Sequence, residues 1–313
     1  MGELKSIFKR KNIKFEKVAN MWLDSKKKYV KESTYYNYMF KINKYIIPEF
    51  KGIDIISIHD YNEFINKLSK KLSASTVKDI IIVLKAILKY YEDEYGHKLK
   101  VKKIKLPKKE KTKLDILNQK EQKKLEEYCE NEGTLLAYGI IICLNTGLRI
   151  GEICALKWEN VDLVNKKIYV ENTVQRIYKD DKRETEVITE SAKTLTAIRT
   201  IPMNKRVFKC LQNIKKKNKD DEFVIVQSNG NRIEPKNYQN YLRKILKINE
   251  IKKCRFHMLR HTFASNCIEI GMDAKTLSEI LGHSNVNTTL NIYVHSSEKL
   301  KKDYLERLNQ RIN

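Results

Sequence analysis

The sequence predicts a mainly helical protein with a small antiparallel β-sheet in its C-terminal domain. Three observations support this fold class. Apolar residues recur at intervals of three and four along most of the chain, as on the buried face of an α-helix. Between residues 167 and 201, β-rich runs separated by polar turns replace this spacing. A lysine-rich segment divides the 313 residues into two parts, and this length is enough for two domains with cores of their own.

The first part, residues 13–97, is predicted to be a compact unit of four helices, preceded by a short basic arm at residues 1–12. The signals are the apolar spacing, serine residues suited to begin helices, and a proline and a glycine suited to end them. The four helices are expected from Phe15 onward, from an N-cap at Ser33 to Pro48, over residues 58–69, and from near Ser75 to Gly96.

A basic linker is expected at residues 98–113, KLKVKKIKLPKKEKTK, which contain nine lysines, one glutamate and one proline. The charge density and Pro107 argue for an extended segment rather than a strand. A segment this basic is attracted to a phosphate backbone, although a solvated spacer is the alternative. The lysines expected to bind DNA are Lys100, Lys102, Lys103, Lys105, Lys108 and Lys109.

The second part, residues 114–313, is predicted to be an α+β domain. Asn118 is a candidate N-cap, and Glu121 three residues later completes a capping box. Helices are expected at 119–130 and 134–145, then the antiparallel sheet within 167–201, and helices again after Pro202 to the end of the chain.

The formal net charge of +24 points to a polyphosphate partner, namely DNA, RNA or an anionic membrane. Residues 1–113 carry an excess of 15 positive charges and the remaining residues an excess of 9. This uneven excess favours nucleic acid over an ordinary solvated surface.

The six cysteines form no CxxC pair, and no His–Cys cluster has zinc spacing. We therefore expect reduced, buried cysteines and no metal site. No apolar run approaches the roughly 18–20 residues that span a bilayer, and the first 14 residues lack the apolar stretch of a signal peptide. The expected location is the cytoplasm, with no membrane partner.

Two polar motifs of the second part interrupt apolar helical runs. In TGLRIGE, two glycines bracket Arg149, which indicates tight packing that aims the guanidinium into a cleft or pairs it with Glu152. In HMLRH, His257 and Arg260 are three residues apart and share one helix face, an arrangement that suits a phosphate. His261 lies off that face and is expected to be structural.

A third motif, LGHSN, is a glycine-punctuated turn that carries His283. Ten residues later comes Tyr293, in an apolar helical segment. A tyrosine in such a segment is more often a core residue than a nucleophile, so Tyr293 gains meaning only together with the other motifs.

Taken together, these motifs resemble the active site of the tyrosine recombinases, the phage integrase family. The matching segments are TGLRIGE, HMLRH, LGHSN and IYVH. The resemblance extends over essentially the whole chain and implies a helical SAM-like core-binding domain, a linker and an α+β catalytic domain. The residues that match the family's active site are, in chain order, Arg149, Lys193, His257, Arg260, His283 and Tyr293.

The resemblance implies phosphoryl transfer without metal or nucleotide. Tyr293 would attack a DNA phosphodiester to form a 3′-phosphotyrosyl bond, and this covalent bond conserves the energy needed for rejoining. Arg149 and Arg260 would clamp the non-bridging oxygens of the transition state. The sequence has no GxxxxGK[ST] loop and no convincing carboxylate cluster for magnesium, so no cofactor is expected.

The proton transfers are also assigned by resemblance. His257 would act as the base for the tyrosine, because a free tyrosine has a pKa of about 10, and His283 would hydrogen-bond a non-bridging oxygen. Lys193, on a turn between two strands, would protonate the leaving 5′ oxygen, with Lys182 as its nearest rival. Glu152 would orient His257 or Arg149.

The implied partners are double-stranded DNA and further copies of the chain, monomeric when free and tetrameric on DNA. The stretch from Glu298 to Asn313 is amphipathic and is expected either to pack on its own domain or to dock on a neighbouring protomer. An accessory directionality factor is a further possible partner. The apolar residues of the stretch at helical spacing are Leu300, Tyr304, Leu305 and Leu308.

Several functions fit this chemistry. Integration and excision of a mobile element is favoured over Xer-type resolution of chromosome or plasmid dimers. A type IB topoisomerase would use a similar residue set without exchanging partners. A non-catalytic DNA-binding protein on a recombinase fold is the alternative of another class. The target DNA sequence is not legible from the chain.

Overall fold

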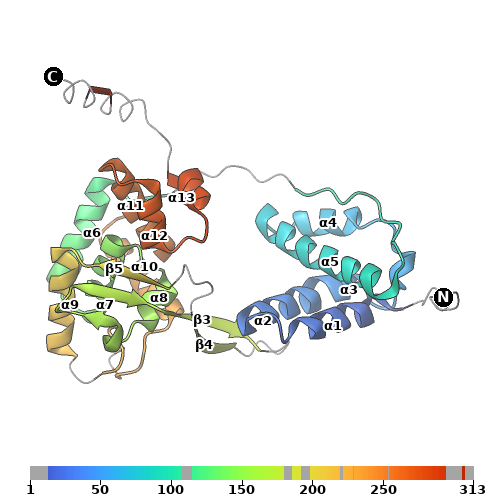
Figure 1. Cartoon of the computed structure of the whole chain (residues 1–313), viewed down its shortest axis with the longest axis horizontal. Coiled ribbons are helices and arrows are strands. Elements are labelled where there is room, and N and C mark those ends of the chain that lie inside the picture. The colour runs from blue at the N-terminus through green and yellow to red at the C-terminus, as the bar shows by residue number, and fades with distance from the viewer. Residues whose placement is uncertain are drawn as a thin grey trace, which may run out of the picture. The chain divides into compact units, whose positions relative to one another are not determined.

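A computed structural model of the chain divides into two compact units, whose elements are labelled in Figure 1. One unit consists of Met1–Thr112 with Ile177–Glu186, and the other of Lys113–Arg176 with Val187–Asn313. Each unit is described by itself. The structure describes residues 13–107, 115–179, 185–191, 198–218, 221–227, 229–252, 254–293 and 305–306, without the side chains of residues 178, 191 and 291–293.

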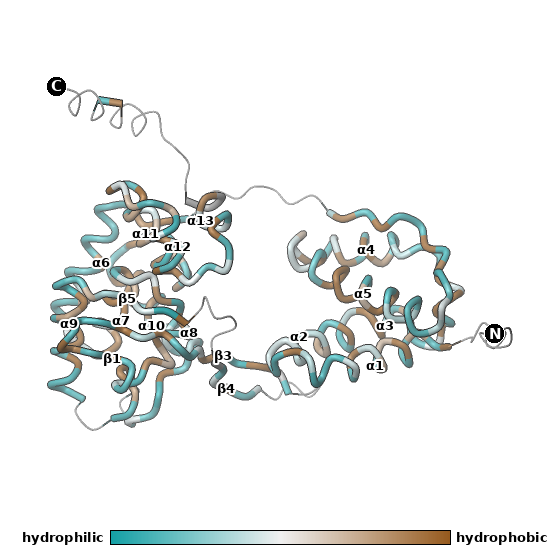
Figure 2. Tube along the Cα trace, in the orientation of Figure 1, coloured by the Kyte–Doolittle hydropathy of each residue, from teal (hydrophilic) through white to brown (hydrophobic). Residues whose placement is uncertain are grey.

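The first unit is helical around a single core. Phe50 packs against three other aromatic rings of this core, with ring centroids 5.1 Å from Phe15, 5.2 Å from Tyr61 and 5.1 Å from Phe64. The apolar residues of α5 show as brown stretches in Figure 2. The elements are α1 (Phe15–Lys26), α2 (Glu32–Lys41), a π-helical turn (Ile42–Ile46), α3 (Ile47–Phe50), a 3₁₀ turn (Ile55–Ser57), α4 (Asn62–Ser69) and α5 (Ala74–Tyr95).

The expected end of the second helix at Pro48 is wrong. Proline has no N–H to donate to the carbonyl four residues earlier, and this ordinarily stops a helix. Here the five residues before α3 widen into a π-turn in which the Ile47 N–H donates to the Ile42 carbonyl, so Pro48 falls in the first turn of α3. A missing N–H costs nothing in a first turn.

Three helix starts also differ from the expectation. The residue before α2 is Lys31, and Ser33 lies inside that helix. The third helix begins at Asn62 rather than at residue 58, and residues 58–61, which follow the 3₁₀ turn, are neither helix nor strand. Helix α5 is capped by Ser73, whose side chain accepts from the Thr76 N–H at 3.3 Å.

Residues 98–107 of the expected linker are extended, without helix or strand. Their backbone is bound to the first unit, since the Lys102 N–H donates to the His59 carbonyl at 2.8 Å and the Lys105 N–H to Asn62 Oδ1 at 3.1 Å. Leu99, Val101 and Ile104 pack against the first core. This stretch is therefore a docked segment rather than a free spacer.

The second unit surrounds a central helix, α7 (Leu135–Thr146), which packs against α6, α9, α10 and α11. The Asn118–Glu121 capping box at the start of α6 is present as predicted. The other helices are α6 (Gln119–Glu132), α8 (Ile150–Ala155), a 3₁₀ turn (Trp158–Asn160), α9 (Lys205–Lys217), α10 (Pro235–Ile248), α11 (Phe256–Glu269), α12 (Ala274–Leu281) and α13 (Val286–Tyr293).

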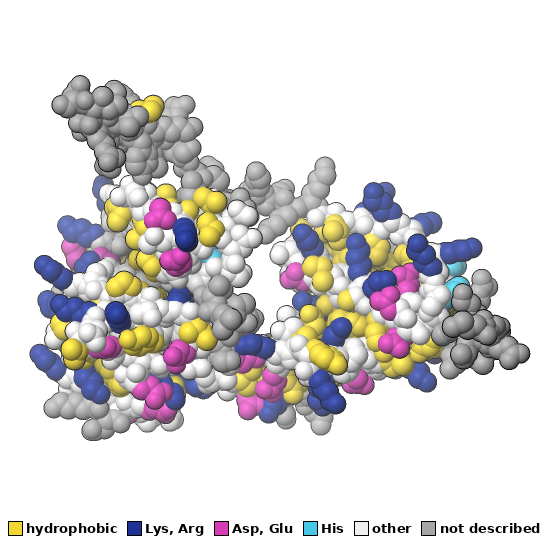
Figure 3. Space-filling model, viewed as in Figure 1, with side chains coloured by type: hydrophobic (Ala, Val, Ile, Leu, Met, Phe, Trp, Pro, Cys, Tyr) yellow, Lys and Arg dark blue, Asp and Glu magenta, His cyan; other side chains and the backbone are white. Residues whose placement is uncertain are grey.

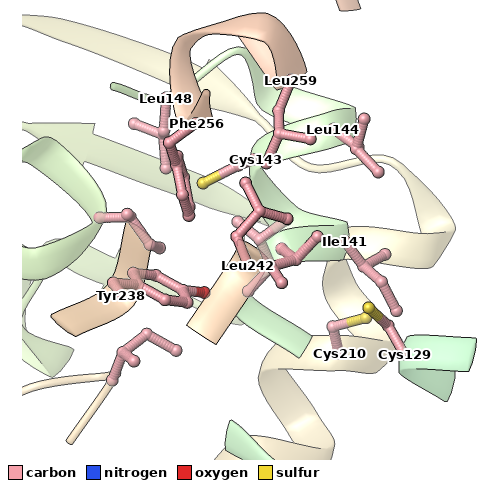
Figure 4. Packing of buried hydrophobic residues seen from close by; sticks show 14 of the residues in the cluster. Cys129, Ile141, Cys143, Leu144, Leu148, Cys210, Tyr238, Leu242, Phe256 and Leu259 are labelled. Carbon is pink, nitrogen blue, oxygen red and sulfur yellow. The ribbon is translucent and has the colours of Figure 1, made fainter. Parts of the chain in front are cut away.

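The core around α7 is apolar and includes cysteines that act as small hydrophobic residues (Figure 4). Cys143 packs near Phe256 and Leu259, while Cys129 and Cys210 lie together between α6 and α9. All six cysteines are free and buried, and burial raises the pKa of the Cys143 thiol well above its usual range. These thiols are packing residues, as expected.

Two small antiparallel sheets confirm the predicted fold class. One has the order β1–β2–β5 and pairs Ile168 with Ile201 and Val170 with Arg199. The other is the β3–β4 pair. The strands are β1 (Val161–Asp162), β2 (Lys167–Val170), β3 (Asn172–Tyr178), β4 (Thr185–Ser191) and β5 (Arg199–Pro202).

Within the described ranges, no helix combines the length and the apolar character needed to cross a membrane.

Candidate active site

Arg260 is the most deeply buried charged group of the site, with 1 % of its surface exposed. It lies on α11, and its guanidinium donates to the Gly147 carbonyl at 2.9 Å and to the Leu281 carbonyl at 2.7 Å. These carbonyls lie at the C-terminal ends of α7 and α12, where carbonyls lack helical partners and the helix dipole is negative. The two helix ends therefore compensate the buried positive charge.

Arg149 lies immediately before α8 and is the more accessible arginine, with 35 % of its side chain exposed. Its backbone N–H donates to Glu152 Oε2 at 2.9 Å, and its Nη1 donates to Glu152 Oε1 at 2.6 Å. Its Nη2 donates to the Gly282 carbonyl at 3.3 Å. Arg149 and Arg260 thus bind adjacent carbonyls at the end of α12, which places their positive charges close together.

The glycines that bracket Arg149 permit this close packing, as expected. Gly147 has a φ of +67°, and a Cβ there would lie 2.7 Å from the side chains of Leu281 and Phe263. At Gly151, a Cβ would lie 2.5 Å from the backbone carbonyl of Val174. A larger residue at Gly147 would therefore collide with α12, and one at Gly151 would collide with β3.

Glu152 binds Arg149, and it also binds an arginine that sequence reasoning missed. Arg199, at the start of β5, donates to Glu152 Oε1 at 3.1 Å and to Oε2 at 2.9 Å, and both side chains are nearly inaccessible. Burial alone would raise the pKa of Glu152, but the hydrogen bonds and charge of Arg199, together with Arg149, lower that pKa to about 2. Glu152 is therefore a carboxylate throughout the neutral range.

His257 lies one helical turn before Arg260 on α11. Its ring meets the ring of His261 edge-on, with centroids 4.5 Å apart. Part of the side chain is exposed. Partial burial of the ring nevertheless lowers the pKa of His257 to about 4, and the charges of His261, Arg260 and Arg149 act in the same direction. The ring is thus neutral at pH 7 and able to accept a proton.

His283 follows the C-terminal end of α12, where Gly282 has a φ of +66°. Its Nδ1 is 2.8 Å from the hydroxyl of buried Thr289, so Nε2 is the ring nitrogen that can meet a ligand. Burial, followed by the charges of Arg260 and Arg149, lowers the pKa of His283 to about 4. His283 is therefore a neutral hydrogen-bonding group beside the two arginines.

The structure brings Arg149, Glu152, Arg260 and His283 together at the end of α12, with His257 on the adjacent face of α11. Tyr293 is the last residue of α13, which packs against α11 and α12; its side chain is not described. Lys193 and its rival Lys182 lie outside the described residues, as do Lys108 and Lys109.

In the described part of the chain, no three His, Cys, Asp or Glu side chains are grouped to hold a metal ion.

A family model described as the phage integrase family matches residues 115–299, and one described as the phage integrase N-terminal SAM-like domain matches residues 14–69. The chain belongs to the phage integrase family. All the site residues, from Arg149 to Tyr293, lie within the first match.

Relatives in this family include integrases and Xer-like recombinases. The chain is 30% identical to a tyrosine recombinase XerC-like protein of Caldanaerobacter subterraneus subsp. tengcongensis, over 82% of this chain and 72% of that protein. It is 29% identical to the integrase of Staphylococcus phage L54a, over 78% and 77% of the two chains. The fold matches a Tn1549 transposon integrase, solved with transposon right end DNA, with a TM-score of 0.80 and 22% identity over 95% and 100%.

The histidine pKa values give a first prediction. In the free protein, NMR titration of the ring protons should place the pKa values of both His257 and His283 near 4, assigned with His257→Gln and His283→Gln variants. Because the folded state disfavours protonation, the stability that the neutral rings contribute is complete above pH 6.5 and is lost as the pH falls toward 4. A pKa above 6 for either ring would contradict this environment.

A second prediction concerns Glu152. Glu152→Gln leaves two arginines without their carboxylate, and breaking a buried ion pair in this way costs about 3–5 kcal/mol of unfolding free energy. The loss of unfolding free energy should have its maximum value above pH 4.5. It should become smaller as the pH falls toward 2, where the wild-type carboxylate also becomes protonated. Urea unfolding at pH 7 and pH 3 measures both effects.

The control for Glu152→Gln is Glu159→Gln, which removes an exposed carboxylate paired with Lys157. Exposed pairs contribute little to stability. Equal effects of the two substitutions would show that Glu152 does not hold the arginines as described.

Proposed function

We propose that this protein is a tyrosine-type site-specific DNA recombinase, which cuts and rejoins double-stranded DNA through a covalent bond to Tyr293. The observation that carries the proposal is the pair of arginines, Arg149 and Arg260, held side by side at the end of α12 with neutral His283. Such a set of fixed N–H donors suits the extra negative charge that develops on a phosphodiester during transfer.

In the first step, the hydroxyl oxygen of Tyr293 attacks the phosphorus. The bond from phosphorus to the 5′ oxygen breaks, and a 3′-phosphotyrosyl bond forms. His257, neutral because its pKa is lowered, accepts the tyrosine proton. Lys193 donates a proton to the leaving 5′ oxygen. The number of phosphoester bonds is unchanged, so a 5′-hydroxyl of a partner strand can reverse the step without ATP.

During this transfer, Arg149 binds the non-bridging oxygens, and the positive charge of Arg260, whose guanidinium is buried on two carbonyls, stabilises the same oxygens. Arg149 is exposed enough to meet the phosphate first, whereas Arg260 supplies a charge fixed beneath the surface. His283 donates to a non-bridging oxygen through Nε2, while its Nδ1 accepts from the Thr289 hydroxyl. Glu152 orients Arg149 and remains ionised while doing so.

DNA would also contact the docked linker segment and other basic surfaces. Lysine and arginine side chains are prominent on the visible face over α4 and α5 (Figure 3). Lys100, Lys103 and Lys105 are exposed, while Lys102 pairs with Asp60 at 3.2 Å. We assign the exposed lysines to phosphate contacts, and we extend the assignment to Lys108 and Lys109.

For the biological role, we favour integration and excision of a mobile element, carried out in the cytoplasm by a tetramer assembled on DNA from monomers. The support is the similarity to phage and transposon integrases. The similarity to XerC-like and XerA proteins supports the second candidate, which is resolution of chromosome or plasmid dimers. Docking of the segment from Glu298 to Asn313 on a neighbouring protomer and an accessory directionality factor belong to the same proposal.

The chemistry predicts a covalent protein–DNA adduct. Wild-type protein incubated with a nicked suicide substrate carrying the DNA that flanks its gene should give an adduct that survives boiling in detergent, with EDTA present throughout. Tyr293→Phe should bind the same DNA and give no adduct, because the nucleophilic oxygen is gone.

The matched control is Tyr29→Phe, a tyrosine with 85 % of its surface exposed, which should cleave as wild type does. An adduct formed by Tyr293→Phe would mean that another residue is the nucleophile. Tight binding without any adduct from wild type would favour a non-catalytic DNA-binding protein, and relaxation of supercoils without strand exchange would favour a topoisomerase.

The exposed lysines of the docked linker segment predict that the affinity of the protein for DNA falls as the salt concentration rises. Each lost phosphate contact reduces the slope of log affinity against log salt by about 0.9. Replacing Lys100, Lys103 and Lys105 with alanine together should lower the magnitude of the slope by up to about 2.7, measured by fluorescence anisotropy on duplex DNA. A triple variant of exposed lysines on α6, at Lys120, Lys123 and Lys124, serves as the control. Equal slopes for the two triple variants would remove the linker from the DNA interface.

A further inference from the structure

Three arginines bind three consecutive carbonyls at the C-terminal end of α12. Arg199 Nε donates to the carbonyl of residue 280 at 2.5 Å, and Arg260 Nη2 to that of residue 281 at 2.7 Å. Arg149 Nη2 donates to the carbonyl of residue 282 at 3.3 Å. The three side chains come from β5, α11 and the start of α8. The next residue after these carbonyls is His283.

Among the three, Arg199 is placed so that it does not meet DNA. Its side chain is 5 % exposed, and both of its terminal nitrogens donate to the carboxylate of Glu152. Its backbone is held as well, because Arg199 pairs with Val170 of β2. Arg199 is therefore a buried, rigidly held cation beside the site, which distinguishes it from the accessible Arg149.

Arg199 is hydrogen-bonded to two parts of the candidate site, the carboxylate of Glu152 and the end of α12. Through Glu152, it holds the carboxylate that binds both the backbone and the guanidinium of Arg149. Through the carbonyl of Ile280, it holds the turn that ends in His283. Since β5 begins at Arg199, the same residue anchors the strand that follows the segment containing Lys193. The Arg199 side chain thus contacts Glu152, which holds Arg149, and the end of α12, which carries His283. Arg149 and His283 are the groups that would bind the phosphate.

We propose that Arg199 is a positioning residue for DNA cleavage, which fixes Arg149 through Glu152 and His283 through the end of α12. This inference rests on the proposed recombinase function. It predicts that loss of Arg199 slows the chemical step, because a misplacement of about 1 Å can cost about 100-fold in rate. DNA affinity should change little, since Arg199 does not contact the phosphate.

The test compares Arg199→Met and Arg199→Lys with Arg206→Met. Arg206 is a suitable control because it also pairs with a buried carboxylate, Glu126, but on α9 and outside the site. For each variant, the measurements are the single-turnover rate of adduct formation, the DNA affinity, the melting temperature and the pKa of His283 by NMR.

Arg199→Met should reduce the cleavage rate by about 100-fold with DNA affinity within about twofold of wild type. The pKa of His283 should rise, because the charge of Arg199 is one of those that lower it. Arg199→Lys keeps the charge but loses the planar fork, so it should keep the low pKa of His283 and still cleave slowly. Arg206→Met should lower the melting temperature and leave the cleavage rate and the pKa of His283 unchanged.

Equal cleavage rates and equal His283 pKa values in Arg199→Met and Arg206→Met would overturn the positioning role while leaving the recombinase function intact. If Arg199→Met does not fold, normal cleavage by folded Arg199→Lys would overturn the role equally. Absence of an adduct from wild type would instead defeat the proposed function. In that case, an unchanged pKa of His283 in Arg199→Met would still refute the positioning of the α12 turn.

Discussion

The candidate active site depends on the binding of arginine side chains by the C-terminal carbonyls of α12. These carbonyls have no partners within the helix and carry the negative end of its dipole. Arg149 and Arg260 bind two of them, and Arg149 is 133 residues away from its acceptor in sequence. Buried Glu152 supplies the remaining negative charge. The site can therefore hold several positive charges in place before a phosphate arrives, which is the condition for electrostatic catalysis without reorganisation.

The surrounding fold serves this arrangement. Gly147 lets the end of α7 approach α12, because a side chain there would collide with Leu281. At the start of α11, the Phe256 N–H donates to Gln239 Oε1 at 2.7 Å, and the Phe256 ring packs on Tyr238 with centroids 4.7 Å apart. These contacts fix the first turn of α11, from which His257 and Arg260 extend. Apolar packing of the second unit thus sets the geometry of a strongly polar site.

The same cations that would bind phosphate also control the histidines. Arg149 and Arg260 both lower the pKa of His257 and of His283, in addition to burial. A protonated imidazole would add a further positive charge to an already cationic site, so the neutral form is favoured. A neutral His257 is able to accept a proton from a tyrosine hydroxyl, whereas a protonated one is not. Charge crowding therefore keeps both rings neutral in the free protein, and it makes His257 a weaker base until the negative charge of a bound phosphate offsets the cations.

Sequence reasoning was most successful where the partners are near in the chain. The capping box of Asn118 and Glu121 spans three residues, and the glycines around Arg149 are two residues from it. By contrast, Pro48 was misjudged as a helix end, because a π-turn accommodates its missing N–H. Local spacing thus supplied most of the helices and the small sheet, whereas the candidate site residues came from the resemblance to a family. Arg199 could be found only in the tertiary structure, because its partners Glu152 and Ile280 are 47 and 81 residues away and an arginine in a short strand carries no local signal.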